Sequence, residues 1–204
     1  MLWVLLSGCG PSLSPVDAVP VMGMDHDPVD YEGSEQLYCT SCDGSGFPYC
    51  YDGHDGSDFD LIDGFETMDE GSATVVAAAA GTVVETEDGH YDRCRLDPQP
   101  LGPTCDGHEM AANLVTVEHT GGHRTTYKHL MQWSVAVTPG DQVERGATLG
   151  RVGSSGCSTA PHVHLELLSP TGERIDPFAG PYSQDYTWWC EQDGPDGLPG
   201  DLYP

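Results

Sequence analysis

The chain has 204 residues, enough for one domain with flanking segments and a sizeable hydrophobic core. It carries 33 acidic residues against 7 lysines and arginines, for a formal charge of −26, and no lysine or arginine precedes Arg93. So acidic a chain is not attracted to nucleic acid or to anionic lipid surfaces, which excludes both as partners. The acids are scattered along the chain, and we interpret them as a solubilising surface rather than a docking site for a cationic partner.

The chain begins with a short apolar run, MLWVLLSGC, that ends in Leu-Ser-Gly-Cys. This ending resembles a bacterial lipoprotein signal, in which Cys9 would be lipidated and become the first mature residue. No other apolar stretch approaches the roughly 20 residues needed to span a bilayer. We therefore expect residues 1–9 to be a signal segment and the membrane to be contacted only through a lipid on Cys9. The expected location is the cell envelope or the medium outside the cell.

Two polar segments are expected to flank the folded domain. Residues 10–35 are rich in Pro, Gly, Ser and Asp and show no periodicity, which predicts a flexible linker. Residues 186–204 are rich in Pro and Gly and are expected to form a frayed tail. Residues 36–185 then make up the domain, which we expect to be a monomer. The eight cysteines indicate an oxidising compartment.

The first predicted strands lie in residues 73–88, ATVVAAAAGTVVETED, which suggest two short strands around Gly81. The alanine run Ala77–Ala80 is expected to belong to a buried strand, because β-branched residues flank it. No helical period of useful length is visible anywhere in the chain.

The later predicted elements are also strands. Residues 113–130 alternate between apolar and polar on either side of Gly121-Gly122, which predicts a hairpin. Short apolar runs broken by Pro and Gly follow within residues 133–153, and HVHLELL at 162–168 is a further strand. The fold class is therefore mainly β with antiparallel sheets.

The strand at 162–168 carries the first candidate site. Side chains alternate along a strand, so His162, His164 and Glu166 share one face while apolar residues take the other. Same-face neighbours lie roughly 6.5–7 Å apart, so one imidazole can ligate a metal while the other reaches toward substrate bound to it. Taken alone, such a pattern is more often a polar strand face turned to solvent.

Two other segments supply groups of the same chemistry. GHDGSDFD places His54 and Asp58 four residues apart where a strand begins, and imidazole nitrogen and carboxylate oxygen are common Zn²⁺ ligands. The ordinary interpretation of this segment is a turn rich in Asp and Gly. TYKHL places His129 at the end of the predicted hairpin. Each segment alone is a weak signal.

Together and in this order, the segments resemble the lysostaphin-type, or LytM-like, zinc endopeptidases. The family shows His-x-Gly-x-Asp, matched here by residues 54–58, and Tyr-x-His-Leu, matched by residues 127–130. It ends with a Gly/Ser/Thr-rich loop running into His-x-His, matched by GSSGCSTAPHVH at 153–164. The resemblance covers roughly residues 50–180 and extends to order, spacing and residue types. It implies an antiparallel β-sheet catalytic domain, similar to a duplicated hybrid motif, with loop insertions.

The resemblance also implies a zinc site. His54, Asp58 and His164 would hold Zn²⁺, and three protein ligands leave one coordination position open, as a catalytic zinc needs. His129 and His162 would stand beside the metal as catalytic histidines, and the sequence leaves open which of them does what.

Two alternatives to this ligand set remain. Asp60 shares a strand face with Asp58 and is a possible replacement, although the His-x-Gly-x-Asp spacing favours Asp58. A cysteine-rich zinc site is the second alternative, and it would take His54 together with three cysteines, Cys39, Cys42 and Cys50. It is the weaker one, because export favours disulfides and the family motif already accounts for His54.

An insertion at residues 89–110 departs from the family pattern. Cys94 and Cys105 within it are expected to form a local disulfide worth about 3 kcal/mol on the loop-entropy model. Cys157 precedes the His-x-His motif and is interpreted as a structural thiol or disulfide partner. The remaining histidines are expected to face solvent: His26, His90, His108, His119 and His123.

The function implied by the resemblance is an exported zinc metalloendopeptidase that acts on the stem or cross-link peptides of peptidoglycan. The alternatives are a non-catalytic LytM-like regulator of cell-wall amidases, a secreted protease acting on Gly-rich proteins, and a disulfide-rich binding domain without stoichiometric metal. The presence of all five site residues argues against the regulator, since such domains lack the ligands.

Overall fold

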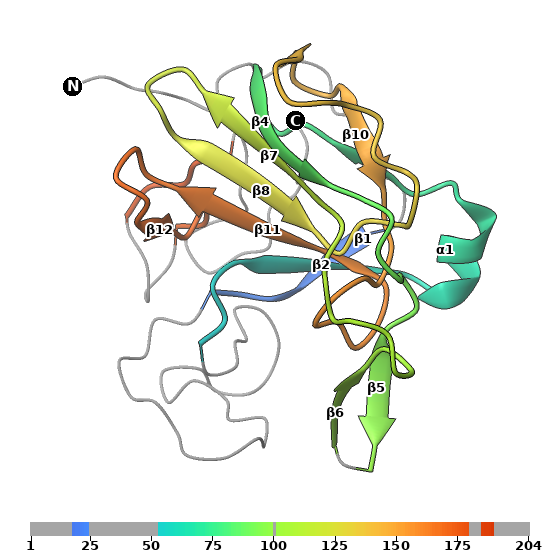
Figure 1. Cartoon of the computed structure of the whole chain (residues 1–204). Helices are drawn as coiled ribbons and strands as arrows, with labels where there is room; N and C mark the ends of the chain where they lie inside the picture. Colours follow the sequence, from blue (N-terminus) through green and yellow to red (C-terminus); the bar gives the residue numbers. More distant parts are fainter. Residues whose placement is uncertain (1–17, 25–52, 100, 180–184, 190–204) are drawn as a thin grey trace.

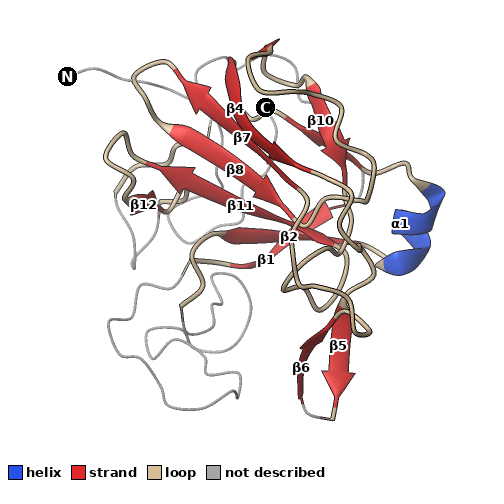
Figure 2. Ribbon diagram, in the orientation of Figure 1, coloured by secondary structure: helices blue, strands red, loops and turns tan. Residues whose placement is uncertain are grey.

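A computed structural model describes residues 18–24, 53–99, 101–179 and 185–189 of the chain. The described part is built mainly from antiparallel strands, with one short helix at its edge, α1 (Phe65–Glu70) (Figures 1 and 2). The predicted fold class is therefore confirmed. No described helix has the length and apolar character that crossing a membrane requires.

One large sheet carries most of the chain, and its main path runs in the order β1-β2-β11-β8-β7-β4-β9, with β12 pairing beside β11 (Figure 1). The bounds of these strands are β1 (Ala18–Met22), β2 (Ser57–Leu61), β11 (His162–Leu168), β8 (Arg124–Lys128), β7 (Leu114–His119), β4 (Gly81–Glu87), β9 (Gln142–Val143) and β12 (Arg174–Ile175). The predicted hairpin is confirmed as β7–β8, and the predicted last strand at 162–168 is β11. The candidate site motifs thus fall on neighbouring strands.

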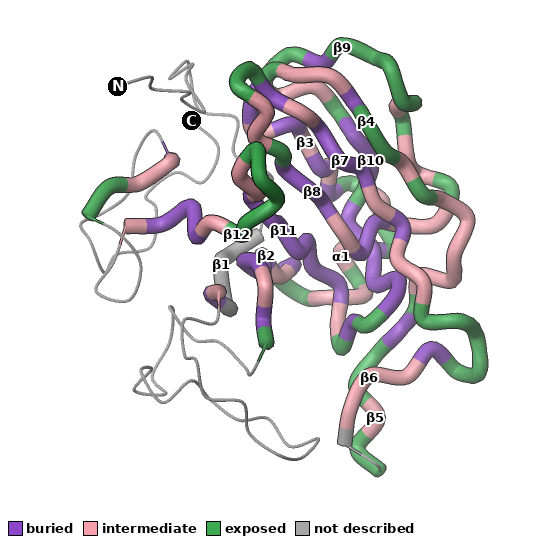
Figure 3. The backbone as a smooth tube through the Cα atoms, turned by 60° about the vertical axis from the view of Figure 1, so that its left-hand side comes forward, coloured by how far each residue is buried: buried purple, intermediate pink, exposed green. Residues whose placement is uncertain are grey.

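The hydrophobic core is shared between the large sheet and a two-stranded sheet made of β3 (Thr74–Val76) and β10 (Thr148–Arg151). Phe59, Val163 and Tyr127 come to this core from the large sheet, and Val75 and Leu149 come from the small one. Buried segments follow the central strands, whereas exposed segments follow the turns between them (Figure 3). Because the apolar face of β11 belongs to this core, its opposite face is left for polar side chains.

The alanine run Ala77–Ala80 is not a buried strand, so this prediction is wrong. These residues form the connection between β3 and β4. Its backbone is bound from the sides: Tyr127 Oη accepts the Ala78 N–H at 2.7 Å, and His119 Nδ1 lies 3.0 Å from the Ala80 carbonyl oxygen. Ala77 bonds through its backbone to Gly146 and Ala147, and polar side chains from β7 and β8 serve the rest of the run in place of a strand ladder.

Three further segments differ from expectation. The six-residue helix α1 is too short to show a period, and it ends at Gly71, whose φ of 63° suits a left-handed cap. Residues 18–22 lie within the expected linker but form β1, an edge strand that tolerates Pro20. Trp189 lies in the expected tail but is buried and packs edge-on against Phe59. The signal segment, residues 10–17 and 25–35 of the linker, and residues 190–204 lie outside the described residues.

The insertion at 89–110 contains a hairpin of its own, β5 (Arg95–Pro98) paired with β6 (Leu101–Thr104). The predicted disulfide between Cys94 and Cys105 is confirmed, and it closes the base of this hairpin. Both half-cystines are buried.

The expectation that His119 faces solvent is wrong, because it is a buried residue of β7. Its Nδ1 faces the Ala80 carbonyl and its Nε2 lies 2.8 Å from Thr125 Oγ1. Burial lowers the pKa of His119, and the nearby His123 adds to the effect, although the Ala80 carbonyl partly opposes it. The neutral imidazole is thus part of the folded structure.

We expect His119 to make folding pH-dependent. Its pKa in the folded state lies below the unfolded value of about 6.5, so below that pH the unfolded chain binds more protons and stability falls. The free energy of unfolding, measured with denaturant, should fall more steeply between about pH 7.5 and about pH 5.5 for the wild type than for His119→Gln. The exposed His108→Gln is the control and should follow the wild type. A His119 ring that titrates at or above pH 6.5 by NMR contradicts the prediction.

Candidate metal centre

The candidate site lies on the pair of strands β2 and β11. Their antiparallel register sets Asp58 opposite His164 and Asp60 opposite His162. His54 stands just before β2, and His129 follows the end of β8 on the other side of β11. All five residues predicted from the sequence are therefore brought to one place, and all five are buried.

Three ligand atoms meet at the centre of this site. The Asp58 Oδ1 atom lies 2.8 Å from His164 Nδ1 and 3.2 Å from His54 Nε2, and the two nitrogens are 3.1 Å apart. A tetrahedral zinc with bonds of about 2.0–2.1 Å holds its ligand atoms about 3.3 Å apart. The three atoms thus have the mutual spacing of one face of a zinc tetrahedron, and the residues fit the metal that the sequence implies.

A hydrogen bond from Nδ1 of His54 sets its tautomer, so that the other nitrogen, Nε2, faces this centre as an acceptor. Its Nδ1 lies 2.5 Å from the Gly23 carbonyl oxygen, which can only accept, so Nδ1 carries the proton. In the neutral imidazole Nε2 then presents a lone pair to the carboxylate of Asp58. Two acceptors facing each other across 3.2 Å repel unless a positive charge lies between them. The site is therefore suited to a cation.

The charges around the centre also favour a cation there. Burial tends to raise the pKa of Asp58, but the hydrogen bond from His164 acts in the opposite direction and prevails, so the pKa is lowered and the carboxylate is ionised. Burial tends to lower the pKa of His164, but the carboxylates of Asp55, Asp58 and Glu166 raise it to about 10. Without metal the imidazolium supplies the positive charge, and metal binding displaces its proton.

Asp55 and Glu166 form an outer layer that the sequence did not identify. The Nε2 atom of His164 is buried and lies 3.1 Å from Asp55 Oδ1 and 3.5 Å from Glu166 Oε1, although neither contact has the alignment of a hydrogen bond. Lys128 and Arg174 pair with these two carboxylates on the outside. Carboxylates of this kind orient a ligating histidine through its second nitrogen. The available signal was the face that Glu166 shares with His164.

Asp58 and not Asp60 belongs to the ligand group among the described residues. Asp60 is only half-buried, and burial raises its pKa, with the negative charge of Asp58 acting in the same direction. The cysteine-rich alternative rests on Cys39, Cys42 and Cys50, which lie outside the described residues. His54, the fourth member of that alternative, is placed with Asp58 and His164.

His129 and His162 stand next to each other beside the ligand group, with ring centroids 4.6 Å apart. His129 Nδ1 lies 2.6 Å from the Ser155 carbonyl oxygen, and His162 Nδ1 lies 2.7 Å from that of Ala160. Both Nδ1 atoms therefore carry the proton, and in the neutral rings both Nε2 atoms are acceptors. The Nε2 atom of His162 lies 3.6 Å from Asp58 Oδ1, which places it at the edge of the ligand group.

The backbone holds His129 in an unusual conformation. Its φ is 66°, in the left-handed region that residues other than glycine seldom adopt. Burial lowers the pKa of His129 well below its ordinary value, and the neighbouring His162 and His164 contribute to the shift. The strained backbone and the bond to Ser155 together hold a neutral imidazole at the end of β8.

Comparison with known proteins identifies the family. The model of Peptidase family M23 matches residues 53–177, and the chain belongs to this family. Its relatives include the glycyl-glycine endopeptidase ALE-1 of Staphylococcus capitis, 45% identical over 53 residues, and the peptidoglycan DD-endopeptidase ShyA of Vibrio cholerae, 38% identical over 61 residues. These matches cover 26% and 30% of this chain but only 14% of each relative. The resemblance to lysostaphin-type peptidases is confirmed.

A solved structure supports the fold. The SpoIIQ–SpoIIIAH pore forming complex contains a chain that is 22% identical, with a TM-score of 0.50 over 82% of this chain and 86% of that one. The catalytic domain of lysostaphin from Staphylococcus simulans is 24% identical, with a TM-score of 0.44 over 76% of this chain and 85% of that one.

Gly56 gives a test of the ligand geometry. A Cβ atom at this position would lie 2.7 Å from His164 Nε2 and 2.5 Å from the Leu165 carbonyl oxygen. Gly56→Ala should therefore displace the His164 ring and weaken zinc binding at least about tenfold, measured by competition with a chelating dye. Gly107→Ala is the control, since nothing lies within 4 Å of its Cβ position and it costs only left-handed backbone strain. Unchanged zinc affinity in Gly56→Ala contradicts the placement of His164.

Proposed function

We propose that this chain is an exported zinc metalloendopeptidase that hydrolyses peptide bonds in the stem or cross-link peptides of peptidoglycan. Membership of Peptidase family M23 supports the reaction class, and relatives named as peptidoglycan endopeptidases support the substrate class. The observation that carries the proposal is a pair of histidines, His129 and His162, whose Nδ1 atoms are held by backbone carbonyls and which stand beside a buried group of three metal ligands.

His54, Asp58 and His164 would hold the metal and leave one coordination position open. When bound there, Zn²⁺ acidifies a coordinated water and polarises the scissile carbonyl group. The low pKa of His129 keeps its Nε2 free to accept the proton of the attacking water. The new C–O bond forms as this proton leaves the water, and the same proton then passes to the leaving amine as the C–N bond breaks.

His162 has the complementary part. Its Nε2 lies 3.6 Å from Asp58 Oδ1, at the edge of the ligand group. In its protonated state, His162 donates a hydrogen bond to the oxyanion that develops on the oxygen of the scissile carbonyl group. One histidine thus moves a proton while the other stabilises charge, which assigns the two roles that the sequence left open.

Export is part of the proposal. It is supported by the Leu-Ser-Gly-Cys ending of the first apolar run and by the disulfide between Cys94 and Cys105, which persists in oxidising compartments. A lipid on Cys9 would tie the domain to the membrane. Fractionation of the native cells tests this, and recovery from the cytosol would contradict it.

The reaction is tested on purified cell walls with the full chain and two variants. His129→Ala and His162→Ala should each keep zinc near one equivalent while kcat falls by on the order of 10²–10⁴, because both histidines act in the transition state. His123→Ala is the control, since His123 lies at the opposite end of β8 from His129. Mass spectrometry of the released fragments identifies the bond that is cut.

Three outcomes would contradict the proposal. Zinc-loaded, folded variants with wild-type activity would show that both histidines are misassigned. A zinc-loaded wild type that leaves walls intact but stimulates an amidase would favour the regulator. Hydrolysis of casein or elastin without hydrolysis of walls would favour a protease of Gly-rich proteins.

A further inference from the structure

The insertion at 89–110 lies along the loop that precedes β11. Cys94 N–H donates to the Ser154 carbonyl at 2.9 Å, and Leu96 N–H donates to the Thr159 carbonyl at 2.9 Å. In the other direction, Ser154 N–H donates to the Asp92 carbonyl at 3.2 Å and Ser154 Oγ donates to the Cys94 carbonyl at 2.6 Å. The half-cystine segment is thus bonded to the loop along much of its length.

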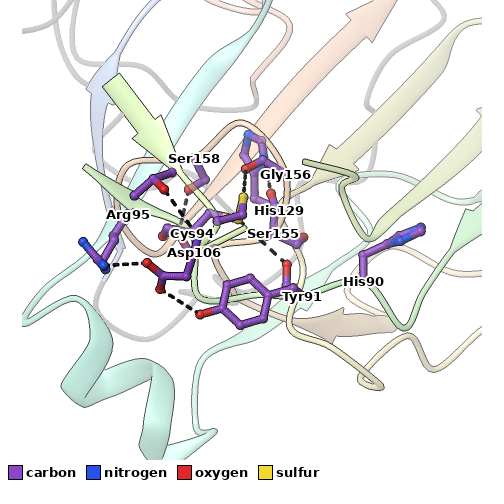
Figure 4. The surroundings of a disulfide bond; sticks show 12 residues. His90, Tyr91, Cys94, Arg95, Asp106, His129, Ser155, Gly156 and Ser158 are labelled. Atoms are coloured by element: carbon purple, nitrogen blue, oxygen red, sulfur yellow. Dashed lines mark hydrogen bonds and ion pairs between the residues drawn. A yellow bond between two sulfur atoms is a disulfide. The ribbon is translucent and has the colours of Figure 1, made fainter. Parts of the chain in front are cut away.

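The same loop holds the catalytic histidines from its other side. The Ser155 carbonyl accepts from His129 Nδ1 and the Ala160 carbonyl accepts from His162 Nδ1. Figure 4 shows His129 and Ser155 next to the disulfide. A hydroxyl chain crosses the loop as well, since Ser154 Oγ lies 2.7 Å from Ser158 Oγ, which lies 3.3 Å from His162 Nδ1. The loop is therefore a layer between the insertion and both histidines.

The loop has little regular structure with which to hold itself. Gly156 within it has a φ of 77°, and a Cβ there would lie 2.9 Å from Ala112 Cβ, two residues beyond the insertion. The second half-cystine also touches the loop, with Cys105 Sγ 3.3 Å from the Gly156 carbonyl oxygen. Contacts with the insertion thus add to the few backbone bonds at the ends of the loop, such as the bridge between Gly153 and His162.

Asn113 ties the insertion to the catalytic strand. It is fully buried, and its side-chain amide bonds both backbone groups of His90, at the start of the insertion, and the carbonyl of Leu130, next to His129. Its own N–H donates to Ser155 Oγ at 2.9 Å. One residue therefore joins the start of the insertion, the loop and the end of β8.

We propose that the insertion closed by Cys94–Cys105 positions both catalytic histidines by fixing the carbonyl groups of Ser155 and Ala160. The two half-cystines, Ser154 and Asn113 are positioning residues, which act on substrate only through His129 and His162. The expected fall in kcat rests on the proposed function. The expected effect of the insertion on the position of the two histidines does not.

The test compares zinc-loaded full chains. The double variant Cys94→Ala/Cys105→Ala opens the insertion, and Ser154→Ala removes the hydroxyl link with the disulfide intact. Both should keep one equivalent of zinc and an unchanged KM while kcat falls about 10- to 100-fold, since misplacement of catalytic groups acts on the transition state. The Nδ1–H proton resonances of His129 and His162, visible when these protons are held by carbonyls, should broaden or exchange faster in both variants. Cys157→Ser is the control, because its exposed thiol lies in the same loop and makes none of these bonds.

The readouts separate the possible failures. Unchanged kcat and unchanged Nδ1–H resonances in both variants would overturn the proposal. Loss of zinc in step with kcat would also overturn it, because the insertion would then only hold the fold together. If the double variant does not fold, Ser154→Ala decides. A wild type without hydrolytic activity, whose Nδ1–H resonances still depend on the disulfide, would refute the proposed function and leave the positioning role standing.

Discussion

Three ligand atoms, from His54, Asp58 and His164, meet in a buried place 2.8–3.2 Å from one another, and a positive charge has to lie among them. The surrounding structure serves this constraint. The register of β2 against β11 sets Asp58 beside His164, and Gly56 lets the imidazole of His164 approach the chain closely. The Gly23 carbonyl fixes the outward nitrogen of His54, and the carboxylate of Asp55 lies 3.1 Å from the outward nitrogen of His164. His129 and His162 lie beside this centre.

The division of labour between strands and loops follows from this arrangement. Strands supply the ligands Asp58 and His164, because regular pairing holds side chains at a fixed spacing. Backbone carbonyls of a loop, Ser155 and Ala160, orient His129 and His162, because a carbonyl dictates which imidazole nitrogen carries the proton. The loop in turn bonds to the disulfide-closed insertion, which we propose fixes its position. On this proposal, the chain combines a buried group of metal ligands with a support that lies in residues 89–110.

Much of the fold and site is predictable because it rests on local patterns. The alternation of HVHLELL fixes which side chains of β11 face the core, and Gly121-Gly122 fixes the turn of the β7–β8 hairpin. His-x-Gly-x-Asp places His54 near Asp58, and the short separation of Cys94 from Cys105 makes their disulfide local. In each case the interacting groups are close in sequence or repeat with the period of a strand.

The remaining features depend on contacts between distant segments. Ala77–Ala80 forms a turn because Tyr127 and His119 bind its backbone, and no pattern within the run reveals these partners. Residues 18–22 have the composition of a linker, but they form a strand because they pair with the otherwise unpaired edge of β2. The carbonyl partners of the catalytic histidines leave no trace in residue type, because any residue carries a carbonyl.

The central claim is that zinc binds to His54, Asp58 and His164, and X-ray absorption at the zinc edge tests it most directly. The full chain loaded with one equivalent of zinc should show only nitrogen and oxygen neighbours at about 2.0–2.2 Å, with two of them imidazoles. Asp58→Ala should lose this signal together with the metal. Sulfur neighbours at about 2.3 Å would contradict the account, because the zinc would then lie on cysteines rather than in the buried group between β2 and β11.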